Sequence, residues 1–340
     1  MRPIAWAASV LLIACAAGCG DRETAVLKVF HAGSLSVPFK EMEGLFEERN
    51  PGVDVQRESY GSAAAIRQVT ELGRPADVIG SADYHLIDQL MIEPEPPWAD
   101  WNVLFARNSV IIASTDADDE MTADNWPEVL ARTDARVGMS NPNHDPCGYR
   151  SLYCVYLADA ALGKEGLFRE LILANSNVAL EEGDDGAAIR VPEAAEYRGR
   201  LTMRPKETDL LALLEAGAID YLFIYRSVAK QHGLHYVELP DEVNLSSPDL
   251  AKQYGRVAVC QYADLPDRSA IVRASPIVYG LTVPREAPNR ELAERFAELV
   301  VSEAGREILE RSGQAPLVPT VLSAASSREA VPAGVLQETR

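Results

Sequence analysis

The stretch Val26-Leu27-Lys28-Val29-Phe30-His31-Ala32-Gly33-Ser34-Leu35-Ser36 runs from a β-rich segment through a short loop into a helix. Its first five residues are apolar or β-branched apart from one lysine, which is typical of a buried strand. His31 to Leu35 form the loop, and Ser36 is placed to cap the helix that follows. Apolar residues then recur at helical spacing: Phe39, Met42, Leu45 and Phe46. A strand, a loop and an amphipathic helix in this order open a βαβ unit.

The same alternation continues through the next fifty residues. A turn at Pro51-Gly52 leads into a second strand at 53–55, and Ser62 opens a helix that Gly73 ends. Residues 76–81 then read as a buried strand. This β-α-β-α-β order predicts a parallel sheet that helices cover on both faces.

A second series of strands and helices follows the tryptophan pair near residue 100. Strands are expected at 109–114, 136–139, 201–204, 221–225 and 277–283, and helices at 148–162, 207–216 and 291–302. Residues after Thr320 are rich in Ala, Ser and Pro without an apolar period, so they read as a loose tail. The order predicts an α/β protein with two lobes and a cleft between them.

The N-terminus reads as an export signal. Met1-Arg2 gives a positive start, and residues 4–17 are apolar or small apart from Ser9. A helix of that length spans about 21 Å at ~1.5 Å per residue, less than the ~30 Å hydrocarbon core of a bilayer. The run is therefore typical of the apolar region of a signal peptide rather than of a permanent membrane span.

Small residues lead into Cys19 and polar residues follow it, an arrangement similar to the lipobox of bacterial lipoproteins. Cys15 also fits that pattern, but cleavage there would leave a very short apolar region. We therefore expect residues 1–18 to be a lipoprotein signal peptide, Cys19 to carry the lipid, and residues 19–25 to form a tether. Ordinary cleavage near Gly20 is the alternative.

Composition narrows the possible functions. The 340 residues contain 51 acidic and 32 basic side chains, a net charge of −19, which disfavours binding to nucleic acid or to an anionic lipid surface.

Cys147 and Cys154 lie seven residues apart on one expected helix, about 10 Å along its axis. That separation is too long for a disulfide. Buried free thiols are the default expectation, and a bridge to Cys260 stays open.

Four loops present small residues, hydroxyls or carboxylates where helices begin: Gly33-Ser34, Gly61-Ser62, Asp145 to Gly148, and Pro205 to Glu207. Helix N-termini carry unpaired N–H groups and a partial positive charge. In open α/β sheets they gather at the carboxyl ends of the strands, where ligands bind. An anion site is therefore expected here in spite of the acidic composition. Taken singly, each loop is also what a simple helix cap looks like.

Together these loops and their neighbours resemble the tungstate/molybdate-binding lipoproteins of ABC importers, in their archaeal-type branch. The similarity runs from about residue 26 to 320, and six segments carry it: 31–36, 60–62, 80–84, 140–150, 204–207 and 225–234. It implies the type II periplasmic-binding fold, in which two α/β lobes close on a ligand. The implied first lobe is 26–106 plus 274–325, the second is 107–273, and 326–340 is a loose C-terminal tail.

The resemblance also implies a ligand set. Ser34 and Ser62 match the serine loops that donate hydrogen bonds to oxo atoms, and Tyr225 matches the tyrosine that closes on the oxyanion. Asp145 and Glu207 match the family's two carboxylates. Because a carboxylate repels a dianion, we expect both to bind the tungsten or molybdenum atom itself and to raise its coordination from four to six. At His144, relatives often carry an acidic residue, so its role stays open.

The implied protein is a non-enzymatic carrier outside the cytoplasm, a monomer tethered to the cell membrane that serves a separate ABC permease. It needs no cofactor beyond its ligand. A catalytic interpretation would use His31, Cys147 or Ser34, but no Gly-x-Ser-x-Gly, His-Glu-x-x-His or Cys-x-x-Cys signature occurs. Other ligands on the same fold remain as alternatives: ferric ion held by Tyr149, Tyr225 and the carboxylates, or sulfate or phosphate. A lipoprotein with a structural or signalling role is a further alternative.

Overall fold

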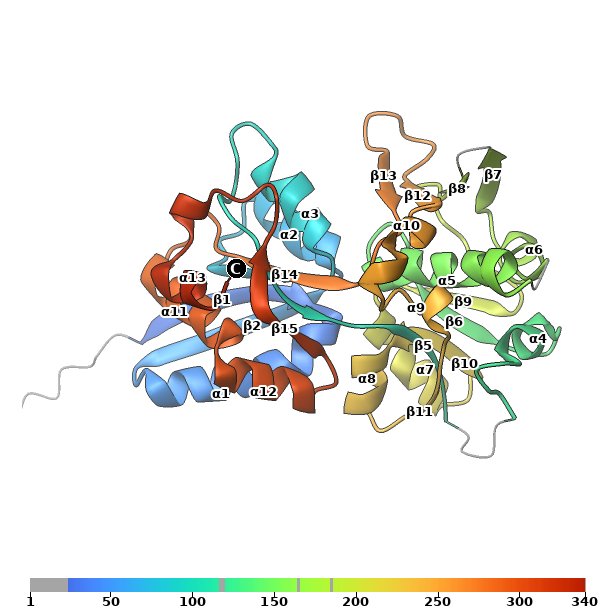
Figure 1. Cartoon of the computed structure of the whole chain (residues 1–340), viewed down its shortest axis with the longest axis horizontal. Coiled ribbons are helices and arrows are strands. Elements are labelled where there is room, and N and C mark those ends of the chain that lie inside the picture. Colours follow the sequence, from blue (N-terminus) through green and yellow to red (C-terminus); the bar gives the residue numbers. More distant parts are fainter. Residues whose placement is uncertain (1–23, 116–119, 164–165, 184–185, 340) are drawn as a thin grey trace, which may run out of the picture.

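The computed structural model describes residues 24–115, 120–163, 166–183 and 186–339. Figure 1 shows two α/β lobes side by side, with the chain passing between them twice. The expected signal peptide, Cys15, Cys19 and all of the tether except its last two residues lie outside the described residues. Within the described residues, no helix has both the length and the apolar character that a membrane span requires.

The first lobe is built on a six-stranded sheet in the order β15-β4-β14-β3-β1-β2. Its strands are β1 (Ala25–Ala32), β2 (Val53–Tyr60), β3 (Val78–Ser81), β4 (Val103–Arg107), β14 (Val278–Thr282) and β15 (Ala315–Leu322). β1 pairs in parallel with β2 and β3, as the repeating β-α order predicts. β14 and β15 join antiparallel to their neighbours, which makes the sheet mixed.

Helices cover this sheet on both sides. They are α1 (Ser36–Arg49), α2 (Ser62–Thr70), α3 (Tyr84–Ile87) with the π-helical turn η2 (Asp88–Ile92), α11 (Arg290–Val301), α12 (Glu303–Arg311) and α13 (Ala333–Gln337), with 3₁₀ turns η1 (Gly33–Leu35) and η6 (Arg328–Ala330). Ser36 does not cap α1, contrary to expectation, because η1 leads directly into the helix. Its hydroxyl donates to Ser59 Oγ instead.

The second lobe contains two sheets. A five-stranded sheet has the order β11-β5-β10-β6-β9, and a four-stranded sheet has the order β13-β12-β8-β7. The strands are β5 (Val110–Ser114), β6 (Val137–Ser140), β7 (Ala179–Gly183), β8 (Gly186–Arg190), β9 (Leu201–Arg204), β10 (Tyr221–Tyr225), β11 (His235–Glu238), β12 (Val257–Gln261) and β13 (Ala270–Arg273). The smaller sheet is not among the elements expected from the sequence. β7 is exposed at four of its five positions and shows no apolar alternation. β12 is buried throughout, so its apolar run was a signal for a strand.

Helix α5 (Pro146–Leu162) is the central element of this lobe. It packs against strands of both sheets, and 12 of its 17 residues are buried. The remaining helices are α4 (Trp126–Ala131), α6 (Leu167–Leu171), α7 (Leu211–Glu215), α8 (Arg226–Gln231), α9 (Asp241–Asn244) and α10 (Ala251–Tyr254), with turns η3 (Leu173–Asn175), η4 (Glu207–Leu210) and η5 (Pro248–Leu250). The N-terminus of α5 faces the first lobe, since Gly61 there touches the residues that precede it. Cys147, Cys154 and Cys260 are free and buried.

Two extended connections join the lobes. The first runs from β4 to β5 and the second from β13 to β14, and Figure 1 shows both between the sheets. They are hydrogen-bonded to each other, since Asn108 N–H donates to Ile277 O at 3.3 Å. The Asn108 amide also donates to Ser227 Oγ and to Tyr279 Oη, both at 2.7 Å. Asn108 therefore ties the connection to both lobes.

The expectation that residues 326–340 form a loose tail is wrong. Val331 and Val335 are 5% and 0% exposed, and α13 packs against α11. Thr320 N–H donates to Glu338 O at 2.9 Å, and Arg306 pairs with the Glu338 carboxylate at 2.7 Å. The sequence could not predict this because one turn of helix with two apolar residues is too short to show a period.

We expect Val335→Ala to lower the free energy of unfolding by about 2 kcal/mol, because it removes two buried methyl groups and leaves a cavity. Gln337→Ala, an exposed position on the same helix, is the control and should change stability by less than about 0.5 kcal/mol. Urea unfolding of the three proteins measures the difference. Equal midpoints would mean that this segment does not contribute to the folded core.

Candidate functional site

The five residues expected to bind an oxyanion all lie where strands end. Ser34 follows β1, Ser62 follows β2, Asp145 follows β6, Glu207 follows β9, and Tyr225 is the last residue of β10. Each of them is at most 3% exposed. The structure therefore places the two serine loops of the first lobe and the three residues of the second at the carboxyl edges of their sheets, where ligands of open α/β folds bind.

Asp145 joins two loops of the second lobe. Its Oδ1 accepts a hydrogen bond from Cys147 N–H at 3.2 Å and so caps α5. Its Oδ2 accepts one from the backbone N–H of Glu207 at 2.8 Å. This second bond is not local in sequence and brings the two expected carboxylates next to each other.

Glu207 carries an unpartnered buried oxygen. Its side chain is 1% exposed, and Oε1 has no hydrogen-bond partner among the described residues. Burial, and then the neighbouring Asp145, raise the pKa of Glu207 well above its usual range. A buried carboxyl oxygen without a partner is costly and is a common mark of a functional position. The arrangement can bind a positive centre placed next to both carboxylates.

The serine hydroxyls are oriented as donors. Tyr279 Oη donates to Ser34 Oγ at 3.0 Å, and Ala82 N–H donates to Ser62 Oγ at 2.9 Å. Because each serine oxygen already accepts a bond, its own hydrogen stays available to an acceptor. Tyr225 is similar, since its oxygen accepts from Arg150 Nη1 at 2.7 Å. Three hydroxyl groups can therefore donate to oxo atoms.

Two glycines let the lobes approach each other at these loops. A Cβ atom on Gly61 would lie 2.3 Å from the carbonyl oxygen of His144, closer than such contacts occur. A Cβ on Gly33 would lie 3.2 Å from Glu207 Oε1. The serine loops of the first lobe thus touch the carboxylate loops of the second through backbone that carries no side chain.

Neither His31 nor Cys147 is set up for nucleophilic or acid–base chemistry. Burial lowers the pKa of His31 to about 4, so the ring is neutral near pH 7, and its Nδ1 bonds Ala32 O at 2.8 Å. Burial, and then Glu207, raise the pKa of the Cys147 thiol well above its usual range. A protonated, buried thiol is a poor nucleophile.

His144 lines a groove of about 410 Å³ between the lobes, which Arg67 of the first lobe and Tyr262 of the second also line. Burial, and then the charge of Arg67, lower the pKa of His144. Its backbone carbonyl lies against the serine loop at Gly61. His144 is exposed, whereas the five expected site residues are buried.

Sequence reasoning gave no role to Arg150, Asp83 or Tyr279, although all three contact the site residues or their neighbours. One signal was available for Arg150: a cation in an otherwise apolar helix is rarely buried unless it is paired. For Tyr279 there was none, since it lies in a strand that reads as ordinary core.

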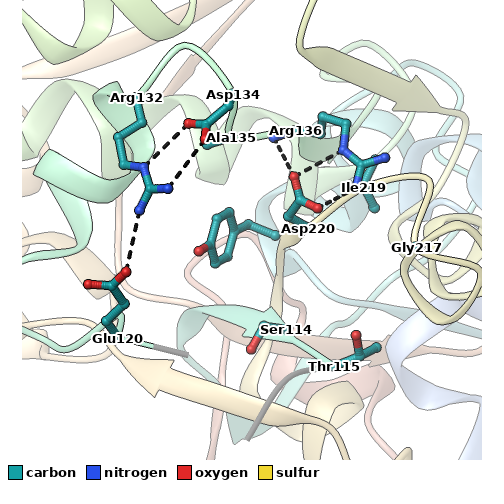
Figure 2. Close-up of a pocket in the computed structure, with 11 residues that line it drawn as sticks. Ser114, Thr115, Glu120, Arg132, Asp134, Ala135, Arg136, Gly217, Ile219 and Asp220 are labelled. Atoms are coloured by element: carbon teal, nitrogen blue, oxygen red, sulfur yellow. Dashed lines mark hydrogen bonds and ion pairs between the residues drawn. The ribbon is translucent and has the colours of Figure 1, made fainter. Parts of the chain in front are cut away.

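A separate pocket of about 600 Å³ lies in the second lobe (Figure 2). Figure 2 shows that Arg132 faces Glu120 and Asp134, while Arg136 pairs with Asp220. The pocket lies at the N-terminal ends of the parallel strands β6 and β10. Asp145 and Tyr225 lie at the opposite side, because Asp145 follows the C-terminal end of β6 and Tyr225 is the last residue of β10. None of the expected site residues lines it.

Comparisons with known proteins agree with this architecture. The family model described as "Bacterial extracellular solute-binding protein" matches residues 27–314. An uncharacterized solute-binding protein of Methanococcus maripaludis (MmarC7_0925) is 43% identical over 324 residues, covering 92% of this chain and 92% of that protein. The molybdate/tungstate-binding protein WtpA of Pyrococcus abyssi is 44% identical over 333 residues, covering 94% of this chain and 93% of the relative.

Among solved structures, the periplasmic molybdate-binding protein of Azotobacter vinelandii superposes with a TM-score of 0.60, covering 86% of this chain and 99% of that chain. At 17% sequence identity this is a likeness of fold alone. It confirms the expected α/β periplasmic-binding fold. By the family match and the near full-length similarity to its relatives, the chain belongs to the bacterial extracellular solute-binding protein family, whose members bind solutes and are not enzymes.

Proposed function

We propose that this protein binds tungstate or molybdate between its lobes and delivers it to the permease of an ABC importer. The single observation that carries the proposal is the adjacent, buried pair Asp145 and Glu207, of which Glu207 Oε1 has no partner among the described residues. The relative WtpA, named for molybdate and tungstate and 44% identical over 94% of this chain, supports the same ligand class.

The oxo atoms of the ligand are held by hydrogen-bond donors. Ser34 and Ser62 supply hydroxyl and backbone N–H groups from the first lobe, and Tyr225 supplies a phenol from the second. Charge-assisted hydrogen bonds of this kind contribute about 1.5–3 kcal/mol each. Since donors come from both lobes, the ligand stabilises their closed arrangement.

The two carboxylates bind the metal atom rather than the oxygen shell. A carboxylate beside a dianion is unfavourable unless it is protonated or has something positive to bind. Hexavalent tungsten and molybdenum are hard, oxygen-seeking centres that can take ligands beyond four, whereas the sulfur of sulfate cannot. The acidic pair Asp145 and Glu207 therefore attracts the larger oxyanions and repels sulfate, and that repulsion provides specificity.

The alternative ligands fit the site less well. Sulfate and phosphate would meet two carboxylates without an expandable centre to satisfy them. Ferric ion in an oxygen site favours anionic ligands, whereas the Tyr225 oxygen accepts a hydrogen bond from Arg150 Nη1, a cation that would repel the ion. Ser34 and Ser62, as hydrogen-bond donors, add nothing to a ferric site.

We further propose that the protein works as a monomer outside the cytoplasm, anchored to the membrane by a lipid on Cys19. The first strand begins at Ala25, so the described fold leaves six residues, 19–24, between the lipid and the first lobe. Extended, they span at most about 20 Å. Such a short tether holds the carrier close to its permease and raises their effective concentration without any new contact.

Tungstate is expected to stabilise the protein against heat. At a concentration of 100 times the Kd, a ligand that binds only the folded state contributes about 2.7 kcal/mol, which raises the melting temperature by several degrees. Scanning calorimetry with tungstate, molybdate, sulfate and phosphate measures this. Stabilisation by sulfate equal to that by tungstate would contradict the role given to the carboxylates.

The double substitution Asp145→Asn with Glu207→Gln removes both charges and nearly keeps the side-chain shapes. We expect the affinity for tungstate to fall at least 100-fold, about 2.7 kcal/mol, and the ratio of sulfate affinity to tungstate affinity to rise. Titration calorimetry measures both. Glu303→Gln, an exposed first-turn residue of α12, is the matched control and should change neither affinity. If the carboxylates served only as helix caps, the double variant would bind tungstate as the natural protein does.

Mass spectrometry of the protein purified from membranes tests the anchor. The expected N-terminus is a lipid-modified Cys19, and Cys19→Ala should release the protein from the membrane fraction while leaving tungstate binding unchanged. A free N-terminus at or near Gly20 in the natural protein would refute the anchor and leave the binding proposal intact.

A further inference from the structure

The side chain of Arg150, a residue of the second lobe, is fully buried and contacts the first lobe. It lies on α5 and is 1% exposed. Its Nη1 donates to the carbonyl oxygen of Ala82 at 2.7 Å, and its Nη2 lies 3.2 Å from Asp83 Oδ2. Ala82 and Asp83 directly follow β3 of the first lobe. Because Arg150 lies on the second lobe and Ala82 and Asp83 on the first, separating the lobes would break these contacts and leave both charges without their partner.

A second buried contact reaches the same carboxylate. Tyr149, also on α5, donates its hydroxyl to Asp83 Oδ2 at 2.5 Å. The other oxygen of Asp83 accepts from His85 N–H at 3.1 Å and caps α3. Asp83 is 2% exposed, so its charge is removed from water and is balanced by groups from the opposite lobe.

The same guanidinium also touches the proposed ligand site. Arg150 Nη1 donates to Tyr225 Oη at 2.7 Å, which leaves the phenol hydrogen free for an oxo atom. On the other side, the residue that accepts from Arg150, Ala82, donates its own N–H to Ser62 Oγ at 2.9 Å. A continuous path of hydrogen bonds therefore joins a donor of each lobe, Ser62 and Tyr225, through Arg150.

We propose that Arg150 is a positioning residue that couples oxyanion binding to lobe closure, with Asp83 and Tyr149 as its partners. In the closed arrangement the guanidinium orients Tyr225 as a donor and completes the charge pair between the lobes. In an open arrangement both functions are lost together. This inference rests on the proposed function for the identity of the ligand, but not for the existence of the interlobe contact.

Tyr149→Phe tests the coupling with little risk to folding, because it removes one hydroxyl. Its matched control is Tyr153→Phe, one turn further along α5, whose equally buried hydroxyl donates to Val272 O within the second lobe. Labels at Leu72→Cys and Ile271→Cys, which are 65% and 70% exposed and lie on opposite lobes, report the interlobe distance. Among the described residues the natural cysteines, Cys147, Cys154 and Cys260, are all buried, so we expect the labels to react at the two introduced, exposed positions.

Two measurements test whether Arg150 and its partners couple ligand binding to the lobe arrangement. Pulsed electron spin resonance should show more of the open arrangement in Tyr149→Phe than in Tyr153→Phe, with and without tungstate. Stopped-flow measurements should show tungstate leaving Tyr149→Phe about tenfold faster than the natural protein, while Tyr153→Phe stays within twofold. Arg150→Lys keeps the charge but cannot bridge all three partners, and we expect it to exceed Tyr149→Phe in both effects.

Equal distance distributions and equal release rates for the two phenylalanine variants would overturn the coupling. If the natural protein shows no response to tungstate, the proposed function fails by itself. The ligand-free distance distributions then still decide whether Arg150 and its partners hold the lobes together, so the two failures are distinguishable.

Discussion

The carboxylate of Asp145 fixes the geometry on which the site depends. It caps α5 through Cys147 N–H and holds the backbone N–H of Glu207, so that two acidic side chains lie next to each other away from water. Burial and Asp145 raise the pKa of Glu207. Such a pair is stabilised either by a proton or by a positive centre bound beside it, and the donors at Ser34 and Ser62 suit the oxo atoms around such a centre. The ligand class that we propose follows from that combination rather than from either part alone.

Contact between the lobes depends on a second set of residues. Gly61 allows backbone contact across the cleft, where a side chain would collide with His144 O. Deeper in the same seam, Arg150 meets Asp83 and the hydroxyl of Tyr225. The contact surface between the lobes thus contains a glycine, Gly61, where a side chain would collide, and a buried charge pair, Arg150 and Asp83. The glycine permits close approach, and each buried charge of the Arg150–Asp83 pair would lose its partner if the two lobes separated there.

Much of this architecture could be predicted from local sequence. The alternation from 26 to 81 correctly indicated the parallel part of the first sheet, because each strand and helix carries its own apolar period. The buried loop positions, such as Glu207, came from resemblance and not from spacing. The exposed strand β7 and the short helix α13 have too few apolar residues to show a pattern. The path through Arg150 could not be predicted, since it joins residues nearly seventy positions apart.

The proposed specificity depends on coordination of the metal atom by the carboxylates of Asp145 and Glu207. X-ray absorption at the tungsten edge, recorded on the protein with one equivalent of tungstate bound, tests it most directly. We expect six oxygen neighbours, four short and two longer, and a return to four in the double variant Asp145→Asn with Glu207→Gln. A purely tetrahedral spectrum from the natural protein would contradict it, because the acidic pair would then face the oxyanion without binding its centre.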